Sequence, residues 1–227
     1  CDYIAQKWGY DRLLQMMQDY ADRKQTPEVI RGRLGMEPAA FDREFLAWLD
    51  TQVGASVKGF AEWSKRVRGL SELAKAKKHD EVIREGLAIR DLYPDYVEAG
   101  SVYEFLSEAY LAKGDKGSAM RQLADYSKQG GRSPATIRQL ADLQIEAGLK
   151  KEAAATLERL NYIYPQDPEM HRKLGSLYLE AGNAAHAVRE YRALVGMKPL
   201  DAAGAHFDLA RALRAARKND EALEQVL

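Results

Sequence analysis

Four histidines are the side chains in this sequence with the clearest capacity for chemistry: His79, His171, His186 and His206. A zinc site needs three or four nitrogen, sulfur or oxygen ligands that converge on one point. His171 and His206 occupy equivalent positions in two neighbouring segments, so their side chains could approach each other. That position usually carries a packing aromatic residue, and we interpret both histidines as partly buried substitutes for it. His79 and His186 fall at turn or helix-surface positions and are expected to be solvated.

The acidic residues and the motif content give no sign of catalysis. Pairs such as Asp80 with Glu81 and Glu221 with Glu224 fall on helix faces that we expect to be exposed. The sequence contains no phosphate loop of the form G-x-x-x-x-G-K-[ST], no G-x-G-x-x-G fingerprint and no G-x-S-x-G nucleophile elbow. We therefore predict that this chain is not an enzyme and uses no cofactor and no metal.

The charge balance narrows the class of partner. The chain has 227 residues, of which 34 are basic and 34 acidic, so its formal net charge is zero. A general nucleic-acid binder would carry a basic excess, and we expect no nucleic-acid partner. No apolar run approaches the roughly 18 residues that span a bilayer, so we expect no direct membrane insertion.

The single cysteine, Cys1, stands where a helical pattern begins at once. We interpret it as the start of an ordered fragment of a longer protein, rather than as the lipidated terminus of a processed bacterial lipoprotein. The sequence favours neither a bacterial periplasm or envelope location nor the cytoplasm.

A spacing of 34 residues runs along most of the chain. It separates three sets of small or helix-ending residues: Gly114, Gly148 and Gly182; Ala119, Ala153 and Ala187; and Pro165 and Pro199. A period of this length with helical patterning inside it predicts a solenoid of helix pairs. Each pair must stack on its neighbours, because it cannot bury its own apolar face.

The segment 168–201 gives the physical reason for each recurring position. We expect Gly175 and Ala187 where two helices cross closely, and Gly182 at the end of the first helix. Pro199 prevents the second helix from continuing. Large residues fill the space between pairs: Leu174, Tyr178, Tyr191 and Leu194.

This pattern resembles the tetratricopeptide repeat, and the resemblance covers 63–227 with four repeats and part of a fifth. In the segment 134–167, Gln144 replaces the usual aromatic residue, so we expect looser packing there. After Asp201 a small slip restarts the pattern at about Ala203. The resemblance implies an all-α protein in which helix–turn–helix units form a right-handed α-solenoid.

Residues 1–62 do not follow the period and are predicted to form a small helical N-terminal unit. Thr26, Pro27 and Glu28 combine a capping hydroxyl, a first-turn proline and an acid near the positive end of the helix dipole. That helix is expected to stop at Gly35, and Pro38 to open another. A preceding helix from Tyr10 to about Lys24 has an apolar face of Leu13, Leu14, Met17, Tyr20 and Ala21.

This N-terminal unit is similar to the C-terminal helices of bacterial peptidase-MA-like domains, which belong to the gluzincin metallopeptidases. The similarity rests on Tyr3-Ile4, Trp8-Gly9-Tyr10-Asp11, Leu13-Leu14, the segment 26–35, Phe41-Asp42, Phe45 and Trp48-Leu49. The H-E-x-x-H zinc motif of that family has no match here, so no catalytic residue is carried over. The resemblance implies that a catalytic part would lie upstream of Cys1.

In tetratricopeptide arrays, the first helices of successive repeats line a concave groove. The residues at groove positions that we expect to bind a partner are Glu104, Glu108, Leu111, Arg138, Asp142, Ile145, Arg172, Leu179, Phe207, Arg211 and Arg214. They combine an apolar line with a charge that changes from acidic to basic along the array. This suits an extended or helical peptide, and we predict a protein-interaction scaffold.

Three alternatives stay open. Charges spaced by four residues are common on exposed helices in any case, and the apolar line could be covered by other parts of the protein. The chain could also be the non-catalytic part of a zinc metallopeptidase, with the repeats presenting substrate or anchoring a complex. A purely structural role would involve self-association through the end after Leu227.

Overall fold

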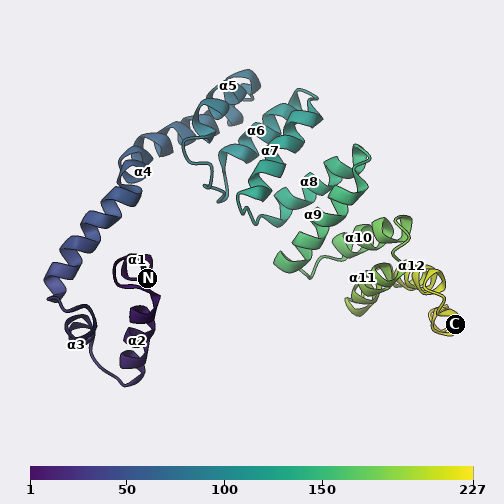
Figure 1. Cartoon of the computed structure of the whole chain (residues 1–227). Coiled ribbons are helices and arrows are strands. Elements are labelled where there is room, and N and C mark those ends of the chain that lie inside the picture. Colours follow the sequence, from purple (N-terminus) through teal and green to yellow (C-terminus); the bar gives the residue numbers. More distant parts are fainter. Residues whose placement is uncertain (227) are drawn as a thin grey trace. The chain divides into compact units, whose positions relative to one another are not determined.

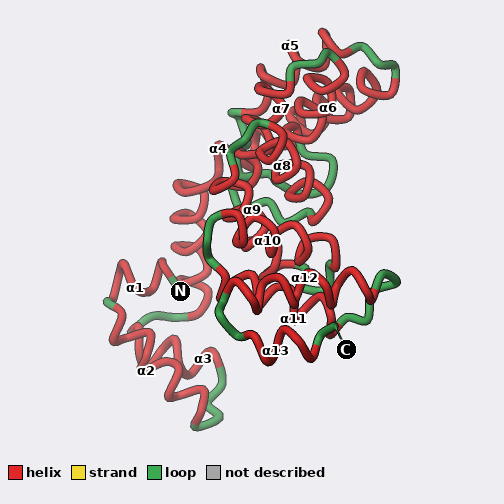
Figure 2. Tube along the Cα trace, turned by 90° about the vertical axis from the view of Figure 1, so that its right-hand side faces the viewer, coloured by secondary structure: helices red, strands yellow, loops and turns green. Residues whose placement is uncertain are grey.

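The computed structural model describes residues 1–226, with the side chains of residues 55 and 56 left out of the description. The chain divides into two compact units, Cys1–Lys65 and Arg66–Leu227, and each is described by itself. The sequence analysis placed a boundary after residue 62, and one continuous helix, α4 (Pro38–Lys75), passes through that position. Within residues 1–226 the structure contains helices and no strands (Figures 1 and 2).

The first unit consists of short helices and the beginning of α4. Its elements are α1 (Asp2–Trp8), α2 (Tyr10–Ala21), α3 (Thr26–Val29) and the π-helical turn η1 (Ile30–Leu34). Gln25, and not Thr26 as predicted, is the N-cap residue of α3, and its backbone N–H donates to Glu28 Oε2 at 3.3 Å. Gly35 ends η1 with a φ of 67°, as its position after the helix predicts.

The core of the first unit uses a different face of α2 from the apolar one noted in the sequence. Met16 is buried with Val29, Ile30 and Leu34, and Asp19 is buried beside Arg33. The apolar residues Leu14, Met17 and Tyr20 are exposed. An aromatic cluster joins α1 to α4, with Tyr3 against Trp8, Phe41, Phe45 and Trp48, and it adjoins this core through Trp8 and Phe41.

The second unit is a succession of helix pairs, in which each helix packs against the one before it and the one after it in the chain. After the end of α4 the helices are α5 (His79–Arg90), α6 (Val102–Ala112), α7 (Lys116–Lys128), α8 (Pro134–Glu146), α9 (Lys150–Ile163), α10 (Pro168–Glu180), α11 (Ala184–Gly196), α12 (Ala202–Ala215) and α13 (Asn219–Glu224). We call α6, α8, α10 and α12 the first helices, because each opens a repeat.

The small residues of the 34-residue pattern have the structural roles predicted for them. Gly114, Gly148 and Gly182 follow first helices with φ values of 78°, 76° and 74°, in a region that costs glycine little. A Cβ on Gly175 would lie 2.7 Å from the Tyr191 ring. The Tyr191 ring therefore lies close against the backbone at Gly175, and a side chain at this position would displace it.

Two details differ from, or refine, the expectations. Gln144 does not loosen the packing, because its side chain is buried and its Oε1 accepts a hydrogen bond of 2.8 Å from Thr156 Oγ1. In the fifth repeat the N-cap Asp201 keeps the 34-residue period with the N-cap Asp167, but α12 has 14 residues where α10 has 13. The slip predicted near Ala203 is thus one extra residue in α12.

Two further observations complete the fold. No helix within residues 1–226 is both long enough and apolar enough to cross a membrane. Leu227, next to which self-association was predicted, lies outside the described residues, so that expectation stays a prediction.

Candidate partner-binding face

The first helices begin at fixed points because each has a side-chain cap. Ser101, Ser133, Asp167 and Asp201 each accept a hydrogen bond from the backbone N–H three residues later. Such caps stabilise a helix start by about 1 kcal/mol. Because the starts are fixed, equivalent residues of successive first helices lie at equivalent places on one surface, which we call the first-helix face.

Two exposed ion pairs repeat along this surface with the period of the sequence. Lys116 Nζ lies 2.6 Å from Glu146 Oε2, and Lys150 Nζ lies 2.5 Å from Glu180 Oε2. Each pair joins the start of a second helix to the end of the next first helix. Exposed pairs contribute little stability, at most about 1 kcal/mol each, but these fix the register between repeats.

The predicted apolar line is only partly available to a partner. Leu111, Ile145 and Leu179 are half-buried, and they pack against the core clusters beneath the face. Phe207 differs from them, with 59% of its surface exposed. Three of the four predicted anchors therefore belong largely to the core of the array, and the fourth projects into solvent.

Several of the predicted groove charges hold successive repeats together. Arg172 Nη1 lies 3.2 Å from Asp201 and 3.7 Å from Asp208, and Arg138 Nη1 lies 3.4 Å from Asp167. Each of these cations contacts acids of the following repeat. The charges of Arg138 and Arg172 therefore serve to hold adjacent helices of the array together.

Asp142 and Glu104 are also engaged by partners within the array. Asp142 pairs with Lys173 at 2.6 Å, a groove cation that the sequence analysis did not single out. Glu104 Oε2 accepts the Gly100 and Ser101 backbone N–H groups at 2.8 and 3.0 Å. Its other oxygen accepts Thr136 Oγ1–H at 2.7 Å.

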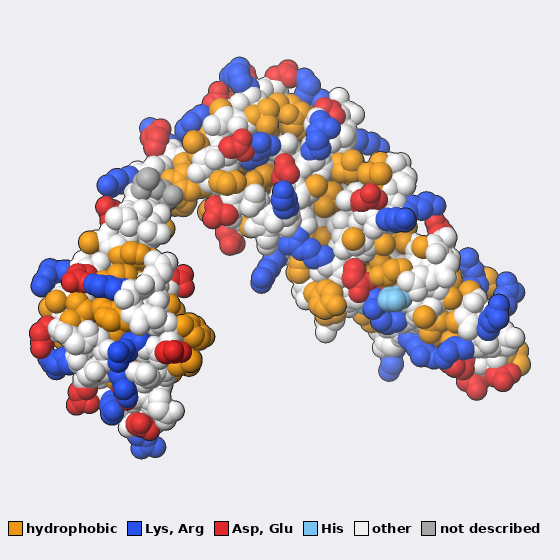
Figure 3. Space-filling view, in the orientation of Figure 1, with side chains coloured by type: hydrophobic (Ala, Val, Ile, Leu, Met, Phe, Trp, Pro, Cys, Tyr) orange, Lys and Arg blue, Asp and Glu red, His pale blue; other side chains and the backbone are white. Residues whose placement is uncertain are grey.

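Two predicted groove charges have no ion pair in the described part of the chain, and a third has one long contact with an acid. Glu108 and Arg214 are exposed, and neither has an ion-pair partner among residues 1–226. Arg211 is exposed as well, with Asp208 at 3.6 Å and its guanidinium 5.9 Å from the centre of the Phe207 ring. The space-filling view shows charged side chains of both signs interspersed on the visible surface (Figure 3).

The first-helix face is hollowed between consecutive elements. A hollow of about 460 Å³ lies between α6 and α8, lined by Gly100, Glu104, Phe105, Glu108, Ser133, Ala135, Thr136 and Gln139. One of about 460 Å³ lies between α8 and α10, lined by Asp142, Ile145, Glu146, Lys150, Lys173, Ser176, Leu177 and Glu180. One of about 550 Å³ lies at α12 and α13, lined by Phe207, Ala210, Arg211, Arg214, Asn219, Ala222, Leu223 and Val226.

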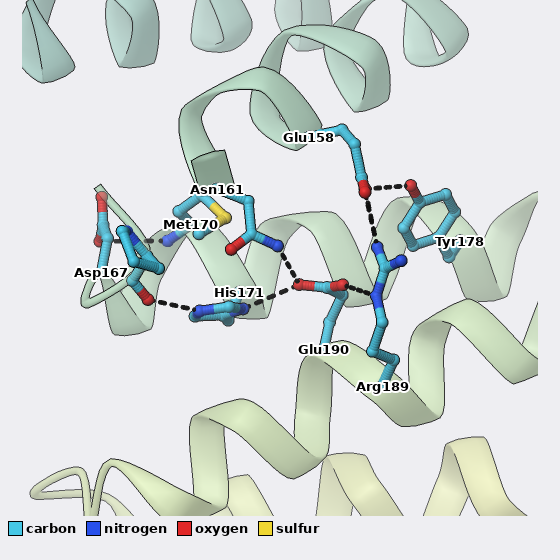
Figure 4. Close-up of polar contacts among 9 residues, drawn as sticks. Glu158, Asn161, Asp167, Met170, His171, Tyr178, Arg189 and Glu190 are labelled. Carbon is cyan, nitrogen blue, oxygen red and sulfur yellow. Dashed lines mark hydrogen bonds and ion pairs between the residues drawn. The ribbon is translucent and has the colours of Figure 1, made fainter. Parts of the chain in front are cut away.

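A buried polar network lies between α9, α10 and α11 (Figure 4). His171 is 3% exposed and Glu190 is 1% exposed. His171 Nδ1–H donates to Glu190 Oε2 and His171 Nε2–H donates to the Pro165 carbonyl, both at 2.8 Å. With Glu190 ionised, both ring nitrogens face acceptors, and this arrangement suits the doubly protonated, cationic ring.

Each residue of this pair stabilises the charged form of the other, and this offsets the cost of burying the two charges. Burial is the largest influence on the pKa of His171 and lowers it, but the hydrogen bonds to Glu190 and the Pro165 carbonyl and the nearby carboxylates together outweigh it, so the net pKa is raised. Burial is also the largest influence on the pKa of Glu190 and raises it, but the hydrogen bonds from His171 and Arg189 and the charges of these two residues together outweigh it, so the net pKa is lowered. The network therefore holds an ion pair and not a neutral pair.

The network continues to the surface through three further side chains. Arg189 Nε–H donates to Glu190 Oε1 at 2.5 Å, and Arg189 also pairs with Glu158 at 2.8 Å. Tyr178 O–H donates to Glu158 Oε2 at 2.6 Å. Burial, together with this bond, raises the pKa of Tyr178 to about 12, so its hydroxyl stays a donor.

His171, His186 and His206 each form hydrogen bonds within the fold. His171 is wholly buried and not partly buried as predicted, because the second helix of the same repeat supplies the Glu190 carboxylate for it. His206 Nδ1 lies 3.0 Å from Gln225 Oε1, and His186 Nδ1 lies 2.7 Å from Asn183 Oδ1. Among the residues described, no group of three histidine, cysteine or acidic side chains is arranged to hold a metal ion.

Comparison with solved structures shows which fold this is. The chain is similar to a crystal structure of MamA, with 19% identity over 71% of this chain and 88% of that one and a TM-score of 0.55. It is also similar to YrrB, described as a tetratricopeptide-repeat protein with an unusual peptide-binding site, with 15% identity over 70% of this chain and 80% of that one and a TM-score of 0.54.

Sequence comparisons add nothing to this: no family model matches the chain, and no curated protein matches it. The resemblance of residues 1–62 to peptidase-MA-like domains has no support in these comparisons and stays a prediction. The structural likenesses, together with the helix pairs and their 34-residue register, confirm the predicted fold class: this is an all-α protein with an α-solenoid of tetratricopeptide-repeat type.

Proposed function

We propose that this chain is a protein-interaction scaffold that binds a partner peptide or helix along the first-helix face. The observation that carries the proposal is that Glu108, Phe207, Arg211 and Arg214 are exposed on this face beside hollows. Aromatic residues and arginine are enriched at surfaces that bind proteins, and polar residues surround them at the rim. The peptide-binding site named for YrrB is a precedent on the same fold.

The spacing of the hollows favours a chain-like ligand over a small molecule. Packed helices lie roughly 10 Å apart, which an extended peptide covers in about three residues at roughly 3.3 Å each. A peptide laid along the face would thus present a side chain to each successive hollow. The hollows are open and separate, whereas small-molecule sites usually enclose most of the ligand.

The test is capture of partners by the native chain and by a variant altered only at exposed positions. The triple variant Glu108→Lys, Phe207→Ala, Arg214→Glu changes no residue of the buried core. Leu179→Glu and Arg172→Glu are less suitable, because Leu179 packs against the core and Arg172 pairs with Asp201 and Asp208. Lys151→Glu, an exposed charge reversal on the second helix α9, is the matched control.

Captured proteins are identified by mass spectrometry, and overlapping synthetic peptides from them are tested by fluorescence anisotropy. We expect at least one peptide to bind the native chain and the Lys151→Glu control equally and the triple variant at least about tenfold more weakly, since several contacts are lost together. Equal binding by all three proteins would exclude the first-helix face as the binding surface.

A further inference from the structure

We infer that the first-helix face binds its partner in one orientation, which is set by charge. A basic residue of the partner segment lies over the hollow between α6 and α8. An acidic residue beside an apolar one lies over the hollow at α12 and α13. This inference rests on the proposed function and names the chemistry of its ligand. It follows from the exposed charges that the ion pairs within the array leave available: Glu108 and Arg214, which have none in the described part of the chain, and Arg211, whose contact with Asp208 is 3.6 Å long.

The hollow between α6 and α8 is acidic. Among its lining residues, Glu104 and Glu108 are charged and none is basic. Glu104 accepts hydrogen bonds through both oxygens, which favours its charged form. Glu108 stands one helical turn further on the same face, exposed and without an ion pair in the described part of the chain. Like charges at this spacing repel, so a lysine or arginine of a ligand is stabilised here by both.

The hollow at α12 and α13 is basic and apolar. Arg211 and Arg214 are its charged lining residues, and no acidic side chain lines it. Exposed apolar surface lies beside them, with Phe207, Leu223 and Val226 each more than half exposed. Guanidinium groups present paired donors that match a carboxylate. An aspartate or glutamate next to a leucine or aromatic residue therefore fits this hollow.

The charges in the middle of the face are already paired with each other, so they do not compete with its two ends for a charged ligand. In the hollow between α8 and α10, Asp142 pairs with Lys173 and Lys150 pairs with Glu180. Arg172, nearer to α12, is already paired with Asp201 and Asp208. The free charge of the face is thus negative at α6 and positive at α12, and a ligand with its charges in the opposite order meets repulsion at both ends.

The separation of the two ends sets the length of the ligand segment. Three repeat steps of roughly 10 Å each lie between α6 and α12, which gives roughly 30 Å. An extended chain covers this in about nine residues. We therefore expect the basic and the acidic residue of the ligand to be about nine positions apart if the ligand is extended.

The experiment uses a random dodecapeptide library displayed on phage and selected on the full chain, with the Lys151→Glu variant as a parallel control. We expect selected peptides to carry lysine or arginine in one half and an acidic residue beside an apolar one in the other, always in the same order. Each peptide is then synthesised in three forms: unchanged, with its basic residues replaced by alanine, and with its acidic residues replaced by alanine.

Double-mutant cycles between the peptides and the protein place each end. Glu108→Gln is expected to weaken the unchanged peptide roughly three- to fivefold, as for an exposed ion pair, and to have no further effect on the peptide without basic residues. Arg214→Gln is expected to do the same with respect to the acidic residues. Both effects should shrink in high salt, because exposed charges are screened.

The outcomes separate this inference from the proposed function. Selected peptides without charge order, or cycles in which Glu108 couples to the acidic residues or to neither end, would overturn the orientation and leave the binding face intact. A selection that enriches no peptide on either protein would overturn both.

Discussion

The buried pair of His171 and Glu190 makes the stability of the array depend on pH in a direction that the structure determines. The folded pKa of His171 is raised above its ordinary value of 6.5, and that of Glu190 is lowered below 4.5. The contribution of His171 is therefore complete below its unfolded pKa and is lost as the pH rises through its folded pKa. The contribution of Glu190 is present above its unfolded pKa and is lost in acid. The pair stabilises the fold most between these limits.

The size of the effect follows from what each substitution leaves behind. His171→Leu leaves a buried carboxylate that retains Arg189 at 2.5 Å and Asn161 at 3.4 Å. Breaking a buried pair costs about 3–5 kcal/mol, and because two partners remain we expect about 3 kcal/mol near pH 6. Replacing both residues by leucine removes the buried charges together, and we expect a change within about 1 kcal/mol. For the native protein, each unit by which the folded pKa of His171 exceeds the unfolded value corresponds to about 1.4 kcal/mol lost on the alkaline side.

The assay is urea unfolding followed by far-UV circular dichroism across the pH range, with hydrogen exchange of α10 and α11 as a local readout. Local exchange is needed because repeat arrays can open at one junction without unfolding completely. The groups that face the pair are Asp167, Arg189 and Glu158, beside Tyr178. His79→Leu, which removes a histidine from the start of α5, away from this network, is the control for loss of a histidine elsewhere.

The reasoning would be refuted by either of two results. One is a native protein whose loss of stability from mildly acidic to alkaline pH equals that of the His171→Leu, Glu190→Leu double variant. The other is a His171→Leu variant that loses less than about 1 kcal/mol near pH 6, which would show that the buried carboxylate does not need its imidazolium partner.

Three further predictions concern side-chain packing and hydrogen bonding within each unit. Gly175→Val should lower the free energy of unfolding by about 1–3 kcal/mol, because a side chain there meets the Tyr191 ring; Gly196→Ala, with open space around it, should be neutral or slightly stabilising in the same urea titration. Gln144→Leu should cost about 1 kcal/mol by stranding the Thr156 hydroxyl, and adding Thr156→Val should recover most of that loss; no recovery would contradict the hydrogen bond. In the first unit, hydrogen bonds from Arg33 and Lys24 lower the pKa of Asp19, so its contribution to stability is present above the unfolded pKa and is lost as the pH falls. Asp19→Asn should therefore destabilise this unit at neutral pH, measured by tryptophan fluorescence. An acid transition that is unchanged in the variant would contradict this prediction.

The parts of the fold that could be predicted from sequence are those with a single physical cause within one repeat. Glycine recurs at the position of Gly182 because the chain needs a positive φ after a first helix, and a small residue is needed at Gly175 because the Tyr191 ring lies against it. The continuity of α4 could not be predicted in this way. Nothing at residues 62–63 breaks a helix, so the change of pattern there is a change of packing partner and not of backbone conformation.

The candidate site was less predictable, because the partners of its residues lie one repeat away. Arg172 stands at a groove position, yet its acids are 29 and 36 residues further along and meet it only through stacking. Glu104 could have been recognised as a cap, since Ser101 and Glu104 form the S-x-x-E pattern of a capping box. The His171–Glu190 spacing of 19 residues recurs in His206 and Gln225, a signal that has meaning only once the repeat geometry is known.

The ion pairs Lys116–Glu146 and Lys150–Glu180 make the middle repeats interchangeable. If residues 134–167 were excised, Ser133 would stand directly before Pro168, and the gap would equal one period of 34 residues. Lys116 would then face Glu180 in place of Glu146, and Ser133 would serve α10 as Asp167 does now. A chain shortened in this way would keep an ion pair and a helix cap of the present kind at the new junction, where α7 would pack against α10. Such a chain would lose reach along its face while keeping the same two charged ends.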